Sequence, residues 1–525
     1  MNDVVIEQIK RELLERLCRH RLTLDTVQEI GSCFNDFASA LGNNDVRSLL
    51  RATTIIHDLV SKLTGTEDVE AVCDRLQGLI PQQIKAGTQS LTRRELFFVW
   101  IGSIDSRSIR NISLWQRANP GYQAYLWFDS RCLLASHYRR LLRERGGLKL
   151  STNSDVIKFQ NRAYAYIKSR IADGQTFDES LIQFLVGMGL DHVGRKLELE
   201  LEKARRLYQG LSHYFRLCDV QDYANTIMDE EFRHYYFREI VLRGNLAAAS
   251  DILRLHVIQL FGGLYVDCDT LPCLDHVFVR TGAHCRQHNI SFAFIDLLKS
   301  EMYMEKIGSL IEFPEFNDEP HHEAATRQSN MQAITEHLHK HYREIVSLIR
   351  LDVHALTLEN AFRPLDEIWL FPEGIRLTGD PYNTNCFNNN VIIANPHSKV
   401  IRIILLEMRR RYRYLGRMGA VDIASEMEVP FEESYWGRLL NYRFDAMDHQ
   451  DNVTVILTGP GLIFEVLSGL GFSLLKLKDQ VSPLSLSYTL YSEKIGITFM
   501  DQTLYTYDHS RSSWMRTFDG HAIVV

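Results

Sequence analysis

Two aspartates that follow a double glycine are the residues of this chain best suited to bind a charged ligand. Residues 261–269 read FGGLYVDCD, so Asp267 and Asp269 stand two positions apart. On an extended chain that spacing places both carboxylates on one side, where they can face a single divalent cation. The glycines permit the left-handed turn that ends the preceding helix, and three apolar residues then form a strand. We predict a metal or nucleotide site here, in preference to a capped surface turn.

The elements that must position these aspartates indicate an α/β domain. Residues 96–102 form a continuous apolar run, as in a buried parallel strand, and residues 124–129 repeat it after a helical stretch at 109–117. Residues 131–256 are helical and rich in charge, so we expect them to cover the sheet. Strands that alternate with helices predict a mostly parallel sheet. Further strands are expected at 263–266, 290–294, 391–394, 454–457 and 497–500.

The N-terminal part is expected to form a separate helical unit at residues 1–90. Its pattern is helical from residue 4 to 86, and turn signals divide it into four helices, which favours an up-down bundle. The first and third loops would then share one end and gather a small basic tip. That tip is either a solvated bundle end or a surface attracted to anionic lipid head groups. Its members are Arg16, Arg19, His20, Arg21 and Lys62.

Composition excludes several classes of protein. The chain has 525 residues, of which 45% are hydrophobic and 24% charged, and this balance is that of a folded globular protein. Asp and Glu (66) outnumber Lys and Arg (59), which disfavours a nucleic-acid binder. The longest apolar runs, such as residues 96–102, are expected to be far shorter than the roughly 20 residues of a membrane span, which predicts a soluble chain. The first 30 residues lack the apolar core of a secretory signal. Nine scattered cysteines without CxxC pairing predict reduced thiols.

The block around the aspartates resembles a known family, the DxD-containing glycosyltransferases of GT-A fold that include the glucosylating domains of the large clostridial toxins. The likeness starts at NLAAASDILR (245–254) and continues through GGLYVDCD. It implies a Rossmann-like nucleotide-sugar-binding domain at 91–525, with a helical insertion at about 131–245 and a C-terminal donor flap at about 505–525. Further blocks agree in order: FVWIG at 98–102, LWFDS at 126–130, FNNNVII at 387–393, LTGPG at 457–461 and HSRSSW at 509–514.

The resemblance implies a pocket for a UDP-sugar donor. Trp100 would stack on the uracil, because a flat indole covers a base at small entropic cost, and a core tryptophan beside Phe97 and Phe98 is the alternative. Asp251 and Arg254 lie three apart on one helix face. By resemblance, Asp251 would hold the transferred sugar and Arg254 the glycosidic oxygen and phosphate; without the motif they would be an ordinary helix ion pair. The pocket would also include Ile101 and Tyr265.

The resemblance also implies a metal ion, Mn²⁺ or Mg²⁺, beside the donor diphosphate. Asp269 would bind the metal directly, while Asp267 would bind the ribose and share the metal through water. Asn388 would hydrogen-bond the sugar, although its neighbours Asn389 and Asn390 leave the assignment open by one residue.

The C-terminal flap departs from the toxins' pattern, because a histidine replaces the glutamate five residues before the tryptophan. His509 would ligate the metal through a neutral ring nitrogen. Ser512 would bind the metal or the β-phosphate, and Trp514 would cover the leaving diphosphate and donate its indole N–H to the glycosidic oxygen. Ordering of this tail over bound donor would exclude water.

By resemblance the chain is a retaining hexosyltransferase that uses UDP-glucose or UDP-GlcNAc. Its acceptor would be a hydroxyl of a host protein, such as a small GTPase, reached by a bacterial effector that enters the host cytoplasm without a Sec signal. The alternatives are a transferase that builds a surface glycan or glycolipid, and a degenerate protein that binds a nucleotide sugar or a partner without turnover. No second carboxylate is placed as a nucleophile, which favours a front-face reaction in which the departing phosphate takes the acceptor's proton.

Overall fold

The structure is a computed structural model of the chain. The predicted fourth N-terminal helix lies largely outside the residues it describes, and the predicted C-terminal flap lies outside them entirely, as do the side chains of residues 383–388. The described residues are 2–17, 23–64, 89–144, 150–288, 293–313, 342–365, 367–371, 373–380, 383–422, 436–445, 453–491 and 499–500, with a few more near residues 75 and 148.

Helices form both the N-terminal unit and most of the α/β domain. The N-terminal helices are α1(Asn2–Leu17), α2(Leu24–Gly42) and α3(Val46–Thr64). The helices that follow are α5(Ser106–Ala118), α6(Ala135–Glu144), α7(Asn153–Ala172), α8(Phe177–Gly187), α9(Asp191–Leu211), α10(Val220–Ile227), α11(Glu230–Arg238), the π-helical turn η4(Glu239–Arg243), α12(Leu246–Phe261), α13(Val279–Gln287), α14(Ala293–Leu310), α16(Tyr342–His354), α17(Lys399–Arg417), η5(Gly437–Arg443), α18(Val453–Leu457), α19(Pro460–Leu475) and α20(Pro483–Tyr491).

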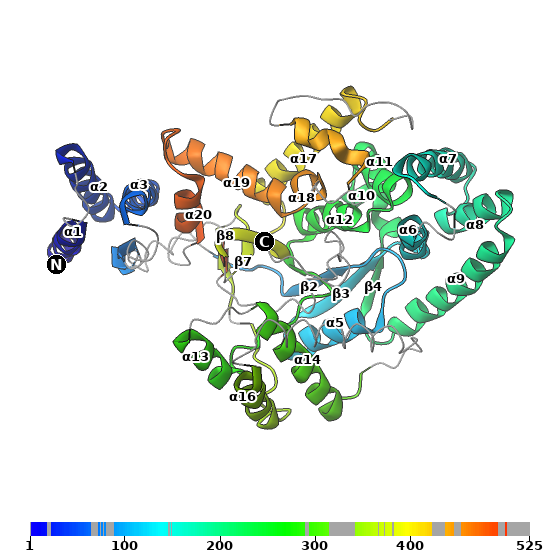
Figure 1. Ribbon diagram of the computed structural model, residues 1–525, viewed down its shortest axis with the longest axis horizontal. Coiled ribbons are helices and arrows are strands. Elements are labelled where there is room, and N and C mark those ends of the chain that lie inside the picture. The colour runs from blue at the N-terminus through cyan, green and yellow to red at the C-terminus, as the bar shows by residue number, and fades with distance from the viewer. Residues whose placement is uncertain are drawn as a thin grey trace.

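A seven-stranded sheet crosses the centre of the α/β domain in the order β4-β3-β2-β5-β8-β7-β9 (Figure 1). Strands β2 to β5 are mutually parallel, β8 is antiparallel to both β5 and β7, and β9 is parallel to β7. The sheet is therefore mixed and mostly parallel, which confirms the predicted α/β class. Its strands are β2(Glu95–Val99), β3(Gln123–Phe128), β4(Arg216–Asp219), β5(Gly263–Val266), β7(Arg376–Asp380), β8(Asn383–Ala394) and β9(Phe499–Met500); β1(Gln89–Ser90) and β6(Trp369–Leu370) form a separate ribbon.

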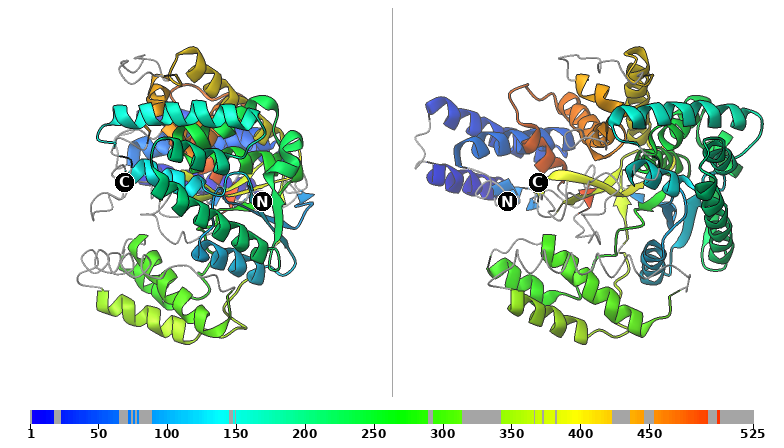
Figure 2. Two further views of the ribbon diagram at one scale, coloured as in Figure 1. Left: turned by 90° about the vertical axis from the view of Figure 1, so that its right-hand side faces the viewer. Right: turned by 45° about the vertical axis from the view of Figure 1, so that its right-hand side comes forward.

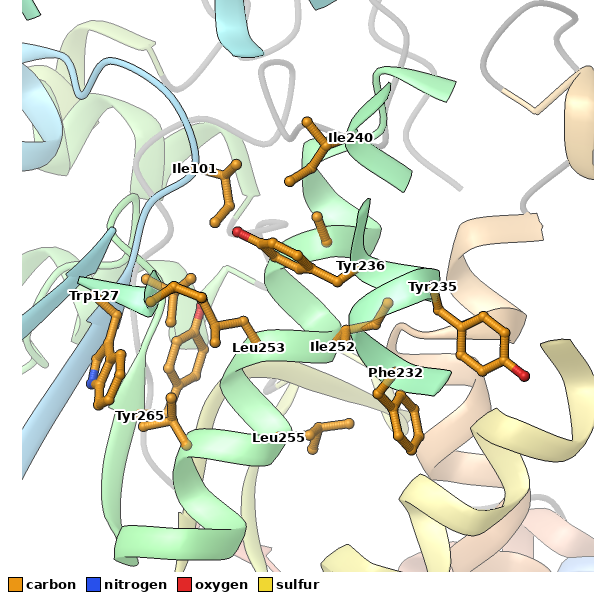
Figure 3. Packing of buried hydrophobic residues seen from close by; sticks show 14 of the residues in the cluster. Ile101, Trp127, Phe232, Tyr235, Tyr236, Ile240, Ile252, Leu253, Leu255 and Tyr265 are labelled. Carbon is orange, nitrogen blue, oxygen red and sulfur yellow. The ribbon is translucent and has the colours of Figure 1, made fainter. Parts of the chain in front are cut away.

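Helix α12 is the element that joins the sheet to the helical part of the molecule. It contacts β2, β5 and β8 on one side and α11 and α17 on others. Figure 3 shows Ile252, Leu253 and Leu255 along this helix, between Tyr265 of the sheet and the aromatic side chains of α11. Residues Ile252 and Leu253 are completely buried, so the rotation of α12 about its axis is set by packing.

Buried side chains of the described residues form three hydrophobic clusters. The largest fills the space between the sheet and its covering helices, a second belongs to α13, α14 and α16, and a third lies within α1 to α3. Figures 1 and 2 show α1 to α3 at one end of the molecule, and α13, α14 and α16 below the sheet, where Arg107 of α5 pairs with Glu301 of α14. The N-terminal helices therefore have a core of their own.

The N-terminal helices attach to the rest of the chain through a polar seam between α3 and α20. Thr54 bonds to Thr489 at 3.0 Å, and the Nδ1 atom of buried His57 lies 3.0 Å from the Oγ atom of Ser485. Lys62 donates to Asp58 at 2.6 Å and to the Gln480 carbonyl at 2.9 Å. One member of the expected basic tip is thus paired within the fold, while Arg19, His20 and Arg21 lie outside the described residues.

Two of the predicted strands are wrong, and other strands of the structure were not predicted. Residues 454–457, expected as a strand, lie in helix α18, because a short apolar run carries no period that separates helix from strand. Of the strand expected at 290–294, Ala293 and Phe294 begin helix α14. Within the stretch expected to be helical, residues 216–219 form strand β4, which is too short for an alternating pattern.

One described stretch, Val453–Leu475, is long and apolar enough to cross a membrane by length and composition alone, and the sequence analysis did not single it out. Gly459 interrupts it between α18 and α19, and half of its most apolar window is buried in the fold. Helix α19 packs against α17, β8 and α20. These contacts are those of a core helix.

Candidate active site

The double glycine makes the turn that the sequence predicts. Gly262 and Gly263 have φ angles of 68° and 99°, a region that favours glycine. A Cβ atom on Gly262 would lie 2.4 Å from Pro396, and one on Gly263 would lie 2.8 Å from the ring of Phe97. Both positions therefore require glycine for space as well as for conformation. The turn seats β5 between β2 and β8, with Asp267 just past its carboxyl end.

The loop that carries the two aspartates is held from both sides. The amide of Asp267 donates to the Asn390 carbonyl of β8 at 2.7 Å. From α5, Asn111 donates to the Cys268 carbonyl at 3.0 Å and Trp115 donates to the Thr270 carbonyl at 2.8 Å. Helix α5 thus donates hydrogen bonds to both carbonyls that flank Asp269, which fixes the position of the loop.

Arg254 links the predicted residues into one charged cluster. Its guanidinium lies 3.1 Å from an oxygen of Asp251 and 2.9 Å from an oxygen of Asp267, and it donates to the Asn389 carbonyl at 2.9 Å. It also lies over the ring of Tyr265, 4.6 Å from the centroid, while the Tyr265 hydroxyl donates to Asp267. The structure therefore brings together four residues that the sequence analysis selected.

Asp251 is held by three donors from three elements. Besides Arg254, the amide of Asn389 donates to its Oδ1 atom at 3.0 Å, and the hydroxyl of Thr458 donates to its Oδ2 atom at 2.8 Å. Asn389 is one residue beyond the asparagine that we selected, Asn388, whose side chain lies outside the described residues. The sequence analysis quoted the block around Thr458 but gave that residue no role.

Burial sets the electrostatics of the cluster. It raises the pKa of Asp251 to about 6 and that of Asp269 to about 7, and it also raises the pKa of Asp267. The charge of Asp267 adds to the rise at the other two aspartates, and Arg254 opposes the rise at all three. Three carboxylates thus share one guanidinium, and a cation bound beside them would relieve the excess negative charge.

The described residues include two neighbouring carboxylates, Asp267 and Asp269, but no complete set of metal ligands. They contain no group of three His, Cys, Asp or Glu side chains that could hold a metal ion. Asp267 and Asp269 offer hard oxygen ligands of the kind that Mn²⁺ and Mg²⁺ prefer. The flap residues His509, Ser512 and Trp514 lie outside the described residues.

The residues predicted to meet the nucleotide base lie at the carboxyl end of β2. Trp100 is partly exposed and donates through its indole nitrogen to the Ser103 carbonyl at 3.0 Å. Ile101 is buried, and Figure 3 shows it close to Ile240 and Tyr236. Because β2 and β5 are parallel neighbours, Trp100 and the aspartate loop lie at the same edge of the sheet, where ligands of α/β folds bind.

Comparison with known proteins identifies relatives of the whole domain. Residues 94–431 match the model of the TcdA/TcdB catalytic glycosyltransferase domain. Toxin A of Clostridium novyi is 21% identical over 492 residues, which cover 84% of this chain and 21% of the toxin. Cytotoxin-L of Paraclostridium sordellii is 22% identical over 363 residues, which cover 64% of this chain and 14% of the toxin. The chain therefore spans about a fifth or less of the length of these toxins.

Solved structures agree with the fold. The catalytic domain of alpha-toxin from Clostridium novyi has a TM-score of 0.63 at 18% identity, covering 96% of this chain and 97% of that domain. The UDP-bound glycosyltransferase domain from the YGT toxin has a TM-score of 0.54 at 18% identity, covering 81% of this chain and 83% of that domain. The fold is thus that of toxin glycosyltransferase domains of GT-A type.

Proposed function

The chain belongs to the family of the TcdA/TcdB catalytic glycosyltransferase domain, and on that premise we propose that it transfers a hexose, glucose or N-acetylglucosamine, from a UDP-sugar to a hydroxyl of a host protein. The observation that carries the proposal is the cluster in which Arg254 joins Asp251 to Asp267 at the carboxyl edge of the sheet. The similarity to a domain solved with UDP bound supports a uridine diphosphate donor.

Each residue of the cluster has a role in this proposal. Three donors already fix the orientation of the Asp251 carboxylate. In that orientation Asp251 accepts hydrogen bonds from hydroxyls of the transferred sugar. Arg254 faces the diphosphate, where its charge stabilises the leaving group. Trp100 and Ile101 receive the uracil, Tyr265 lines the pocket, and the asparagines of β8 contact the sugar.

The flap closes the pocket in the same proposal. His509, Ser512 and Trp514 fold over the donor and exclude water, which favours transfer over hydrolysis. Mn²⁺ or Mg²⁺, held by Asp269 directly and by Asp267 through water, neutralises the charge that gathers on the diphosphate.

We propose a front-face reaction with retention. The hydrogen bonds that hold Asp251 make it a poor nucleophile, so the departing phosphate oxygen accepts the proton of the acceptor hydroxyl on the face where that hydroxyl attacks. A glycosyl adduct trapped on Asp251 would overturn this mechanism.

The acceptor is proposed to be a host protein such as a small GTPase, modified by a bacterial effector inside the host cell. The N-terminal unit at residues 1–90, with its own core, would bring the domain to a membrane surface where such proteins reside.

One assay tests the proposal. The protein is incubated with Mn²⁺, labelled UDP-glucose or UDP-GlcNAc, and host lysate. A labelled protein band is expected. Label confined to lipid or glycan would indicate a surface-glycan transferase, and neither transfer nor donor hydrolysis would indicate a binding protein without turnover.

A further inference from the structure

The short helix α18 ends in a buried hydroxyl that points at the candidate site. Thr458 directly follows α18 and is completely buried. Its hydroxyl lies 2.8 Å from Oδ2 of Asp251 and 3.3 Å from the Thr454 carbonyl. A hydroxyl has one hydrogen, and the shorter distance to a charged acceptor gives the stronger bond. The hydrogen of Thr458 therefore goes to Asp251.

The same helix meets α12 at a second point, one turn earlier. Thr454 accepts a hydrogen bond from the side chain of Asn245 at 2.6 Å. Asn245 caps α12, because its Oδ1 atom accepts from the Ala248 amide at 3.1 Å. Helix α18 and the residue after it thus hydrogen-bond to α12 at two points. One is Asn245, the N-cap of α12, and the other is Asp251 on its second turn. The two contacts leave α12 little freedom to rotate at the site.

We propose that Thr458 is a positioning residue that orients the Asp251 carboxylate for the transferred sugar. Asn389 and Arg254 both hold Oδ1, whereas Thr458 is the donor on Oδ2 among the described residues. Fixing both oxygens sets the plane of the carboxylate before the donor arrives. The inference deepens the proposed function, since it rests on Asp251 binding sugar.

A positioning role for Thr458 predicts a different pattern of effects from a purely structural role. Thr458 reaches the sugar-binding carboxylate, while uracil and ribose are assigned to Trp100, Ile101 and Asp267. Loss of the hydroxyl should therefore weaken steps that involve the sugar and spare the binding of UDP alone. A misplaced carboxylate lowers turnover by about 10- to 100-fold.

The experiment compares Thr458→Val, Thr458→Ser and Thr458→Ala with the unaltered chain. Valine keeps the shape of threonine and removes the hydroxyl. Serine differs from alanine by the hydroxyl alone, so the comparison of Thr458→Ser with Thr458→Ala tests the hydroxyl if the valine variant does not fold. Thr53→Val is the matched control, because buried Thr53 donates to the Leu49 carbonyl within its own helix, far from the site. For each protein, UDP affinity is measured by calorimetry, and kcat and KM for UDP-sugar hydrolysis and protein transfer are measured separately.

The expected result is a 10- to 100-fold lower kcat in Thr458→Val and Thr458→Ala, near-normal kcat in Thr458→Ser and Thr53→Val, and equal UDP affinity in all. Equal turnover of the serine and alanine variants would overturn the inference and leave the proposed function standing. So would a loss of UDP affinity as large as the loss of turnover. If the unaltered chain neither transfers nor hydrolyses a UDP-sugar, the proposed function itself fails, and the inference with it.

Discussion

Two buried clusters of arginine and carboxylate lie along the segment formed by η4 and α12, one at η4 and one in the middle of α12, and they are built differently. In the first, Glu239 is completely buried and accepts from the Tyr412 hydroxyl at 2.8 Å, the Tyr442 hydroxyl at 2.7 Å and Arg243 at 2.7 Å. Arg243 also pairs with Asp445, and Arg238 lies over three tyrosine rings. Here two guanidinium groups, Arg243 and Arg238, face two carboxylates, Glu239 and Asp445, so the charges balance. We call it the Glu239 cluster.

The second, the Asp251 cluster, has more carboxylates than guanidinium groups among the described residues. Asp251, Asp267 and Asp269 share Arg254, and the pKa of each aspartate is raised by burial. A closed cluster with its charges compensated holds helices together, whereas an excess of buried carboxylates is costly and is typical of sites that bind a cation or a ligand. The balance of charge thus marks the Glu239 cluster as a structural network and the Asp251 cluster as a candidate site.

The largest expected effect comes from removing the excess charge. The double variant Asp267→Asn with Asp269→Asn should lower sugar transfer at least about 10³-fold while the fold stays intact, because the diphosphate loses its metal. Transfer is measured with labelled donor, and circular dichroism reports the fold. Asp222→Asn, an exposed change on α10, is the control. Unchanged turnover in the double variant would refute the site assignment.

Breaking the Glu239 cluster should act on stability instead. Glu239→Gln leaves buried Arg243 without one of its charged partners, so the free energy of unfolding should fall by about 3 kcal/mol. Asp251→Asn, which removes one of three carboxylates that share an arginine, should change it by less than about 1 kcal/mol. Urea denaturation measures both. Equal losses would erase the distinction between the clusters.

Ligand binding should stabilise the Asp251 cluster. Mn²⁺ with UDP at a hundredfold excess over Kd should raise the free energy of unfolding by about 2.7 kcal/mol, and a chelator should cancel the part due to the metal. Thermal denaturation with and without EDTA measures the effect. Asp269→Asn should abolish the metal-dependent part, and a metal effect of full size in that variant would remove Asp269 from the ligand set.

The smallest expected effect concerns the seam between α3 and α20. Burial lowers the pKa of His57 to about 4, against the opposing effect of Asp58. Below pH 6.5 the unfolded chain therefore binds a proton at His57 that the folded chain does not bind. The contribution of His57 to stability is fully present above pH 6.5 and is lost as the pH falls towards 4.

Between pH 7.5 and 5.5 this histidine should reduce the free energy of unfolding by roughly 1.4 kcal/mol. The free energy of unfolding is measured for the unaltered chain and for His57→Gln at both pH values. The difference between the two proteins removes the contribution of the other titrating groups. Identical pH dependence in both proteins would show that folding does not lower the pKa of His57.

The sequence predicted the turn and the aspartate loop because their rules are local. Left-handed φ angles favour glycine, and alternation along a strand follows from backbone geometry. The asparagine of β8 was predicted only to within one residue, since three asparagines in a row carry no signal of which one faces α12. Helix α18 was expected as a strand for a similar reason, because a short apolar run suits either structure.

What the sequence alone determined was the family, the α/β class, and the selection of Asp251, Arg254, Tyr265, Asp267 and Asp269, all within one continuous motif. Tertiary structure decided which donors complete that motif. Thr458 meets Asp251 across 207 positions of the chain, and Asn389 does so across 138. It also decided the charge imbalance, because only folding removes these carboxylates from water and, among the described residues, leaves Arg254 as the arginine paired with them.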